Sequence, residues 1–169
     1  AAPSCGGISN LVNSDRKPHP AVADDSYLKR ITCPIAFLSP SNDFHGMIQD
    51  VPKAVKNIQS GNWCVVSSPH MNHRDHAQYA AGSILWFNQF LKNEFIMPKT
   101  PETSSVLNTD GGVPQFTVKP DSSKKIVSVE VYYTQQTESD DMRELSINKF
   151  WHYVAAEKTG EKWTAALPL

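Results

Sequence analysis

The main strand signal of this sequence is the segment ITCPIAFLS at residues 31–39. Its apolar centre is continuous rather than alternating, which predicts a strand covered on both faces and is typical of a parallel sheet. A second short apolar strand is predicted for WCVVS at residues 63–67. Between the two, Asp50 can cap a helix that has Pro52 in its first turn and Gly61 beyond its end. The order strand, helix, strand predicts a parallel α/β unit.

The pattern continues on both sides of this unit. A long amphipathic helix is predicted from about Arg74 to Lys92, where Ala77, Ala81 and Leu85 lie on one apolar stripe. Residues 1–7 are typical of the tail of a preceding strand that enters a turn. Together these segments predict an α/β domain over residues 1–97, with a parallel sheet and flanking helices.

The character of the sequence changes after residue 97. Pro, Thr and Ser are frequent in residues 98–113, which we interpret as a linker. Residues 114–169 are predicted to form a partial β-sandwich of the immunoglobulin or fibronectin III type. The expected strands are 115–119, 126–134, 150–156 and 163–167. A polar, acidic excursion at 135–148 separates the second and third of them.

The composition excludes several classes of protein. The 169 residues include 16 Lys and Arg against 17 Asp and Glu, and no basic cluster predicts binding to nucleic acid or to an anionic membrane. No apolar run approaches the ~20 residues that cross a bilayer. The three cysteines, Cys5, Cys33 and Cys64, cannot form a complete disulfide framework and lack the spacing of a metal site.

Two side chains with catalytic chemistry follow the two predicted strands. Asp43 lies just past the first strand and His73 just past the second. The loops at the carboxyl ends of parallel strands meet at one edge of a sheet, so these loops can place a carboxylate against an imidazole. Such a carboxylate orients the ring and stabilises its protonated form during general-base catalysis. The alternative is that Asp43 forms an Asx turn and His73 is an exposed residue at a helix start.

Other polar and aromatic residues were weighed for binding. His70, His73, His76 and Asp75 contain metal-ligand chemistry, but the three histidines sweep about 300° around a helix at ~100° per residue. We therefore predict neither a metal nor a cofactor. Five aromatic residues of the second part are expected on sheet faces, with a sugar-stacking surface as the alternative: Tyr132, Tyr133, Trp151, Tyr153 and Trp163.

Four segments carry a resemblance to a known family: AAPSCGG (1–7), CPIAFL (33–38), SNDFHG (41–46) and PHMNH (69–73). They resemble the C-terminal half of α/β-hydrolase esterases, especially the acetyl xylan esterase and dienelactone-hydrolase-like proteins, which often carry an appended β domain. The resemblance implies that Asp43 is the acid and His73 the histidine of a catalytic triad. His45 and His70, in the same two loops, are then expected to bind substrate. Members of this family are often exported, which favours a secreted or periplasmic location.

The chain departs from that family at the nucleophile. These hydrolases carry a serine in a G-x-S-x-G turn, and the nearest segment here is APSCG with Ser4 at its centre. The resemblance matches residues 1–7 to the strand after that turn, so the nucleophile, the oxyanion hole and the N-terminal part of the hydrolase domain are expected outside this chain, as a missing partner.

The sequence therefore predicts a C-terminal fragment of a serine-type α/β-hydrolase that acts on a small-molecule or carbohydrate ester. The alternative is a non-catalytic carbohydrate- or protein-binding module. A separation of Asp43 and His73 beyond hydrogen-bond reach would favour that alternative.

Overall fold

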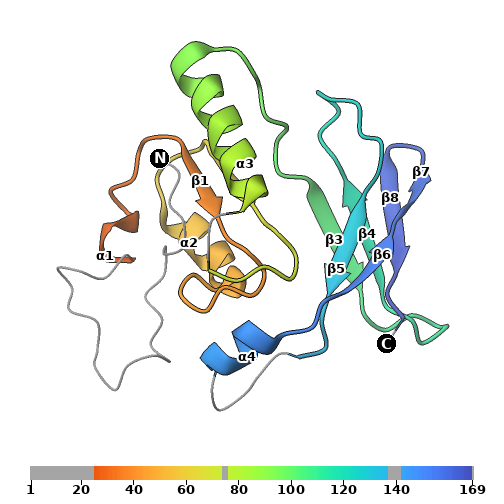
Figure 1. The fold of residues 1–169 in the computed structure, drawn as a ribbon. Coiled ribbons are helices and arrows are strands. Elements are labelled where there is room, and N and C mark those ends of the chain that lie inside the picture. Colours follow the sequence, from red (N-terminus) through yellow and green to blue (C-terminus); the bar gives the residue numbers. More distant parts are fainter. Residues whose placement is uncertain (1–24, 74–75, 137–141, 169) are drawn as a thin grey trace. The chain divides into compact units, whose positions relative to one another are not determined.

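The computed structural model describes residues 25–73, 76–136 and 142–168. The chain divides into two compact units, of which the first comprises residues 1–97 and 138–149 and the second residues 98–137 and 150–169. The chain therefore leaves the second unit after residue 137, contributes a short segment to the first, and returns at residue 150 (Figure 1).

The first unit is built on a parallel pair of strands with helices around it. Its elements are α1 (Asp25–Leu28), β1 (Ile35–Leu38), the 3-10 turn η2 (Ile48–Asp50), α2 (Val51–Asn57), β2 (Trp63–Val66), α3 (Ala77–Phe87), the π-helical turn η3 (Asn88–Lys92) and α4 (Met142–Asn148). β1 pairs in parallel with β2, in a register that sets Ile35 opposite Trp63 and Leu38 opposite Val66. None of the described helices has the length and apolar character needed to span a membrane.

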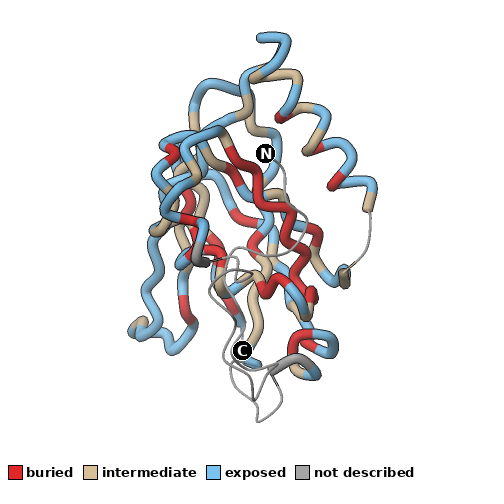
Figure 2. Tube along the Cα trace, turned by 90° about the vertical axis from the view of Figure 1, so that its left-hand side faces the viewer, coloured by how far each residue is buried: buried red, intermediate tan, exposed pale blue. Residues whose placement is uncertain are grey.

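Both faces of β1 are covered because its side chains alternate between two clusters. Ile35 and Phe37 pack with Leu28 of α1 and with Val51 and Ala54 of α2. On the other side, Ala36 packs with Cys64 of β2 and Trp86 of α3. Every residue from 35 to 43 is buried, so the buried run continues past the end of the strand (Figure 2).

The predicted parallel sheet of an α/β-hydrolase is wrong. Among the described residues the parallel sheet has two strands, β1 and β2, and the other two sheets are antiparallel. The physical reason is that helices on both faces bury all four residues of β1 although the sheet has two strands, while β2 stays partly exposed. A continuous apolar run indicates that both faces of a strand are covered, but it does not indicate how many strands the sheet contains.

The second unit is antiparallel throughout its described strands. These are β3 (Glu102–Val106), β4 (Gln115–Lys119), β5 (Glu130–Tyr133), β6 (His152–Ala155), β7 (Glu157–Thr159) and β8 (Lys162–Ala166). They form a four-stranded sheet in the order β3-β4-β8-β7 and a two-stranded sheet of β5 and β6. Both sheets contribute to one core, in which Val118 of β4 and Ala165 of β8 cluster with Val131 of β5.

Where a partial immunoglobulin- or fibronectin III-like sandwich was predicted, the described strands form one four-stranded and one two-stranded antiparallel sheet. β3 lies inside residues 98–113, the segment that was interpreted as a linker, and its five residues are all exposed. An exposed edge strand lacks the apolar alternation that a sequence pattern detects, since neither of its faces is buried. α4 lies inside the predicted excursion at 135–148.

The helix predicted for residues 74–92 is observed as α3 and η3, from Ala77 to Lys92, and residues 74–75 lie outside the described residues. Its contact with β2 depends on Gly82. A Cβ atom added at Gly82 would come within 2.7 Å of a Val66 methyl group, so the absence of a side chain permits the close approach of α3 to the strand.

We expect Gly82→Ala to lower the free energy of unfolding by about 1–2 kcal/mol. The cost of overpacking, roughly 1–3 kcal/mol, exceeds the gain of up to about 1 kcal/mol in helix propensity, because the β-branched Val66 cannot turn away easily. Denaturant unfolding of the variant measures this. Gly61→Ala is the matched control, since nothing lies within 4 Å of the added atom. A Gly82→Ala variant as stable as wild type would contradict the packing argument, and adding Val66→Ala should reduce its cost.

The two described cysteines differ in environment. Cys33 is exposed, whereas Cys64 is buried against Ala36 and Trp86, and this burial raises the pKa of its thiol from 9.0 to about 11. Between these two values the unfolded chain has lost the Cys64 proton while the folded protein retains it. The unfolded state then binds fewer protons, so the free energy of unfolding falls as the pH rises.

We therefore expect the wild type to lose more stability between pH 9 and pH 11 than Cys64→Ala does. Other groups titrate in this range in both proteins, so the difference between the two pH profiles isolates Cys64. Denaturant unfolding at several pH values measures it, and parallel profiles would show that Cys64 ionises equally well in the folded protein.

Candidate functional site

The pairing of β1 with β2 continues beyond both strands and into the loops that carry the candidate residues. Three backbone hydrogen bonds extend it, from the N–H groups of Ser39, Ser41 and Asn42 to the carbonyl oxygens of Val66, Ser68 and Met71, at 3.0, 3.1 and 3.0 Å. The two loops therefore run side by side, and each delivers one ionisable side chain just beyond the last of these bonds.

The structure brings Asp43 and His73 together. The Nδ1 atom of His73 lies 3.0 Å from Oδ2 of Asp43, across 30 residues of sequence. The Asp43 residue is 1% exposed, whereas the His73 side chain is 33% exposed. A buried carboxylate thus supports a histidine that solvent and small molecules can reach, and the separation lies within the hydrogen-bond reach that the catalytic interpretation requires.

The second oxygen of Asp43 fixes the carboxylate in place. Oδ1 accepts the backbone N–H groups of His45 at 2.7 Å and Gly46 at 3.1 Å. The bond to the residue two positions ahead is that of an Asx turn, so this alternative holds at the same time as the contact with His73. Three N–H donors offset the cost of burying the carboxylate and leave it little freedom to rotate.

This geometry assigns the roles of the two ring nitrogens. Both oxygens of Asp43 act as hydrogen-bond acceptors, so the neutral His73 ring carries its proton on Nδ1. Nε2 is then the nitrogen with a lone pair, and it is the atom that can take a proton from a hydroxyl group or water.

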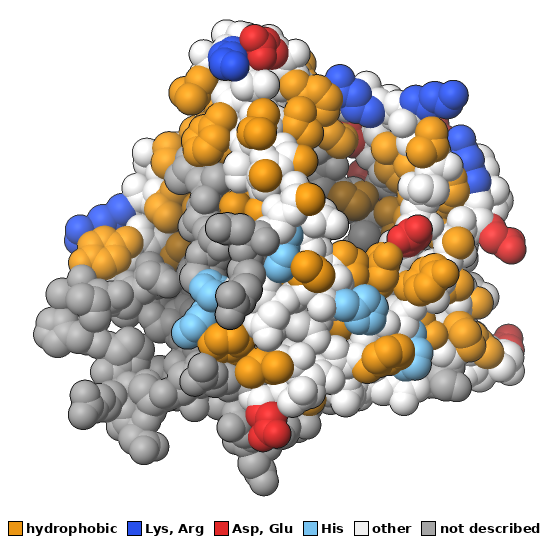
Figure 3. All heavy atoms as spheres, in the orientation of Figure 1, with side chains coloured by type: hydrophobic (Ala, Val, Ile, Leu, Met, Phe, Trp, Pro, Cys, Tyr) orange, Lys and Arg blue, Asp and Glu red, His pale blue; other side chains and the backbone are white. Residues whose placement is uncertain are grey.

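Two further aromatic side chains surround His73. The ring centroid of His45 lies 4.6 Å from that of His73, and Phe44 lies 4.3 Å from His45 and 6.0 Å from His73. Sequence reasoning predicted His45 for substrate binding, and the structure places it beside the dyad with an exposed side chain. Histidine side chains reach the molecular surface in the space-filling view (Figure 3).

His70 lies in the same loop as His73, and its backbone connects this loop to the loop of Asp43. Its φ of 58° is left-handed, which is uncommon for a residue other than glycine. Its N–H group donates to Oγ of Ser41 at 2.8 Å, and the residue as a whole is exposed. His70 therefore joins the two loops, and its predicted contact with substrate stays a prediction.

The ring of His76 is hydrogen-bonded to a backbone carbonyl group. Nε2 of His76 lies 2.7 Å from the carbonyl oxygen of Asn72, and its ring packs on Tyr79. No group of three or more His, Cys, Asp and Glu residues within the described ranges could hold a metal ion. Asp75, which belonged to the alternative metal set, lies outside those ranges.

Sequence reasoning missed Ser41 and Asn42. Asn42 is 6% exposed and directly precedes Asp43, and its side-chain amide donates to the carbonyl oxygen of Lys149 at 2.6 Å. In the segment SNDFHG the sequence analysis singled out Asp43 and His45 but not the serine and the asparagine before them. A buried amide next to a functional acid has no local sequence signal, since its partner is distant in the chain.

The nucleophile is not among the described neighbours of the dyad. In the described part of the chain no hydroxyl group is hydrogen-bonded to His73, and Ser4 lies outside that part. In the first loop the hydroxyl group of Ser41 donates to Oδ1 of Asn42, and the backbone N–H group of Ser39 extends the β1–β2 pairing.

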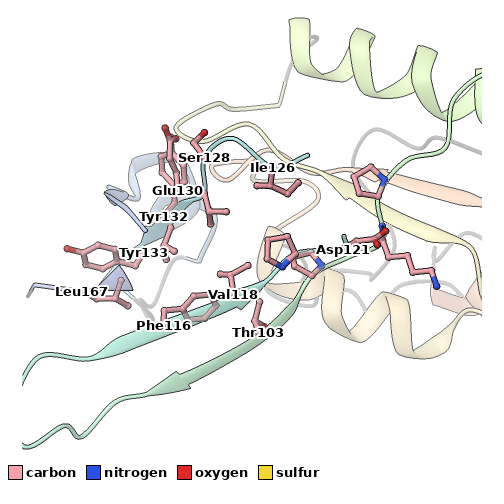
Figure 4. A pocket seen from close by; sticks show the side chains of 16 residues that line it. Thr103, Phe116, Val118, Asp121, Ile126, Ser128, Glu130, Tyr132, Tyr133 and Leu167 are labelled. Carbon is pink, nitrogen blue, oxygen red and sulfur yellow. The ribbon is translucent and has the colours of Figure 1, made fainter. Parts of the chain in front are cut away.

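The second unit has its own pocket, of about 580 Å³. Phe116 and Val118 line it from β4, and Tyr133 and Leu167 line it from elsewhere in the unit (Figure 4). The aromatic residues proposed for sugar stacking do not form one platform: Tyr132 packs on Tyr153, Tyr133 stacks on His152, and Lys158 covers Trp163.

Comparison of this chain with models of protein families, with curated proteins and with solved structures finds no match. The contact between Asp43 and His73 is therefore the observation that bears on function.

We expect Asp43→Asn to reverse the tautomer of His73. The two backbone donors at His45 and Gly46 require an acceptor, so the amide oxygen takes the place of Oδ1 and the amide NH₂ faces Nδ1 of His73. The ring proton then moves to Nε2. Long-range ¹⁵N NMR of the neutral imidazole distinguishes the two tautomers. A variant that keeps the proton on Nδ1 would show that the carboxylate does not set the tautomer.

Proposed function

We propose that this protein is a serine-type hydrolase of carboxylic esters, in which His73 is the general base and Asp43 its orienting acid. The observation that carries the proposal is the 3.0 Å contact between a buried, triply hydrogen-bonded carboxylate and a histidine that is one third exposed. A structural ion pair has no need of an accessible ring, whereas a general base does.

The reaction follows from the assigned nitrogens. Nε2 of His73 accepts the proton of the nucleophilic hydroxyl group as its oxygen attacks the ester carbonyl carbon. The imidazolium, stabilised by Asp43, then gives this proton to the departing alcohol as the ester C–O bond breaks. Water attacks the acyl group in a second round that uses the same nitrogen, releases the acid and restores the hydroxyl group.

The hydroxyl nucleophile belongs to this proposal but lies outside the described residues. Ser4, at the centre of APSCG, is the candidate that the sequence offers for it. His45 is the residue proposed to bind the substrate, a small-molecule or carbohydrate ester. Its exposed ring lies 4.6 Å from the ring of His73, beside the position that a bound ester would occupy. Serine chemistry needs no cofactor in this scheme.

We expect His73→Ala in the intact protein to lower kcat for a short-chain p-nitrophenyl ester by at least about 10³-fold while the unfolding transition stays near that of wild type. Asp43→Asn should also lose most of its activity, since it presents the wrong tautomer. His152→Ala, which removes a histidine of the second unit, is the matched control and should retain full activity. Retention of most activity by His73→Ala would reject the assignment.

A second candidate function is supported by the pocket of about 580 Å³ in the second unit, which has the size of a small-ligand site. A carbohydrate- or protein-binding module would use this pocket and would have no need of the dyad. The two functions are distinguished by the same set of variants, because ligand binding without turnover, unchanged in His73→Ala, is the result that favours the module.

A further inference from the structure

The side chain of Asn42 connects the acid loop to a distant part of the chain. Its Nδ2 atom donates to the carbonyl oxygen of Lys149 at 2.6 Å and lies 3.3 Å from that of Ile147. These partners are 107 and 105 residues away in sequence. They lie at the C-terminal end of α4 and just beyond it, in the segment that leaves the second unit and joins the first.

The other polar groups of Asn42 hold the two loops of the candidate site. Its Oδ1 atom accepts the hydroxyl group of Ser41 at 2.7 Å, and Ser41 Oγ in turn accepts the N–H group of His70. The backbone N–H group of Asn42 donates to the carbonyl oxygen of Met71. One buried side chain and its neighbour therefore join the loop of Asp43, the loop of His73 and the end of α4.

The hydrogen bonds from Asn42 restrain the acid loop at the C-terminal end of α4. The last carbonyl groups of a helix lack partners inside the helix, and the amide of Asn42 supplies a donor to two of them. Ile147 is 38% exposed and Lys149 is 7% exposed, so the hydrogen bond to Ile147 is partly buried and the one to Lys149 is buried. The residue after Asn42 is Asp43, so a constraint on the backbone at 42 also restrains the carboxylate.

We propose that Asn42 is a positioning residue and that α4, with Lys149, is a clamp on the acid loop. The segment between β5 and β6 is then a working part of the Asp43–His73 site. Its task is to hold the carboxylate within hydrogen-bond distance of Nδ1, because a small displacement of an orienting group costs a large factor in rate. The effect on activity rests on the proposed function, whereas the effect on the hydrogen bond does not.

The test uses the full 169-residue chain and reads the hydrogen bond directly. In wild type the His73 Nδ1–H proton should give a downfield ¹H resonance that exchanges slowly with water. Asn42→Ala removes the clamp, and Asn42→Asp replaces the amide donor by an oxygen that faces the two carbonyl groups. In both variants we expect this resonance to broaden or vanish, while Asn57→Ala, which removes an exposed bond from Asn57 to the Lys53 carbonyl oxygen, leaves it unchanged.

Activity separates this proposal from the proposed function. If the protein hydrolyses esters, Asn42→Ala should lower kcat roughly 10- to 100-fold and leave KM near that of wild type. If no turnover is found even in wild type, the proposed function fails and the NMR comparison still decides the clamp.

One measurement needs no variant, in case the substitutions unfold the chain. The side-chain NH₂ protons of Asn42 should be protected from solvent exchange in wild type. Fast exchange of these protons, or an unchanged His73 resonance in folded Asn42→Ala, would overturn the proposal.

Discussion

The parallel backbone pairing of β1 with β2 is the constraint on which the candidate site depends. The hydrogen bonds do not stop at the strand ends, since the N–H groups of residues 39, 41 and 42 still find partners in the second loop. This continuation carries two polar loops forward in register and delivers Asp43 within 3.0 Å of His73. Residues 35–43 are buried, and each face of β1 packs on its own apolar cluster, so this strand and the start of its loop are held rigidly.

Asp43 and His73 have opposite environments, since the side chain of Asp43 is buried and that of His73 is partly exposed. Asp43 is withdrawn from water and held by three N–H donors, so its orientation is set by the protein. His73 is partly exposed on one side of that carboxylate. The amide of Asn42 adds a brace from residues 147 and 149, so that a segment carried between two strands of the second unit supports the acid loop.

Local patterns predicted much of the first unit, and their failures have clear causes. The run ITCPIAFLS was expected to form a strand covered on both faces, and β1 at Ile35–Leu38 is covered on both. The predicted width of the sheet was wrong, because helices on both faces can bury one strand, β1, fully in a sheet of two strands. The exposed β3 and the short α4 were missed for the opposite reason, since neither carries an apolar periodicity strong enough to be recognised.

By itself the sequence determined that an acid and a histidine each follow a short apolar strand, because strand signals and Pro/Gly punctuation are local and read from neighbouring residues. The folded structure was needed to show that the two side chains meet through Nδ1 of His73, that His45 lies beside the ring, and that the N–H group of His70 donates to Ser41. It also decided the partners of Asn42. Hydrogen bonds across 105 and 107 residues leave no periodicity in the sequence, since they depend on where the folded chain brings α4.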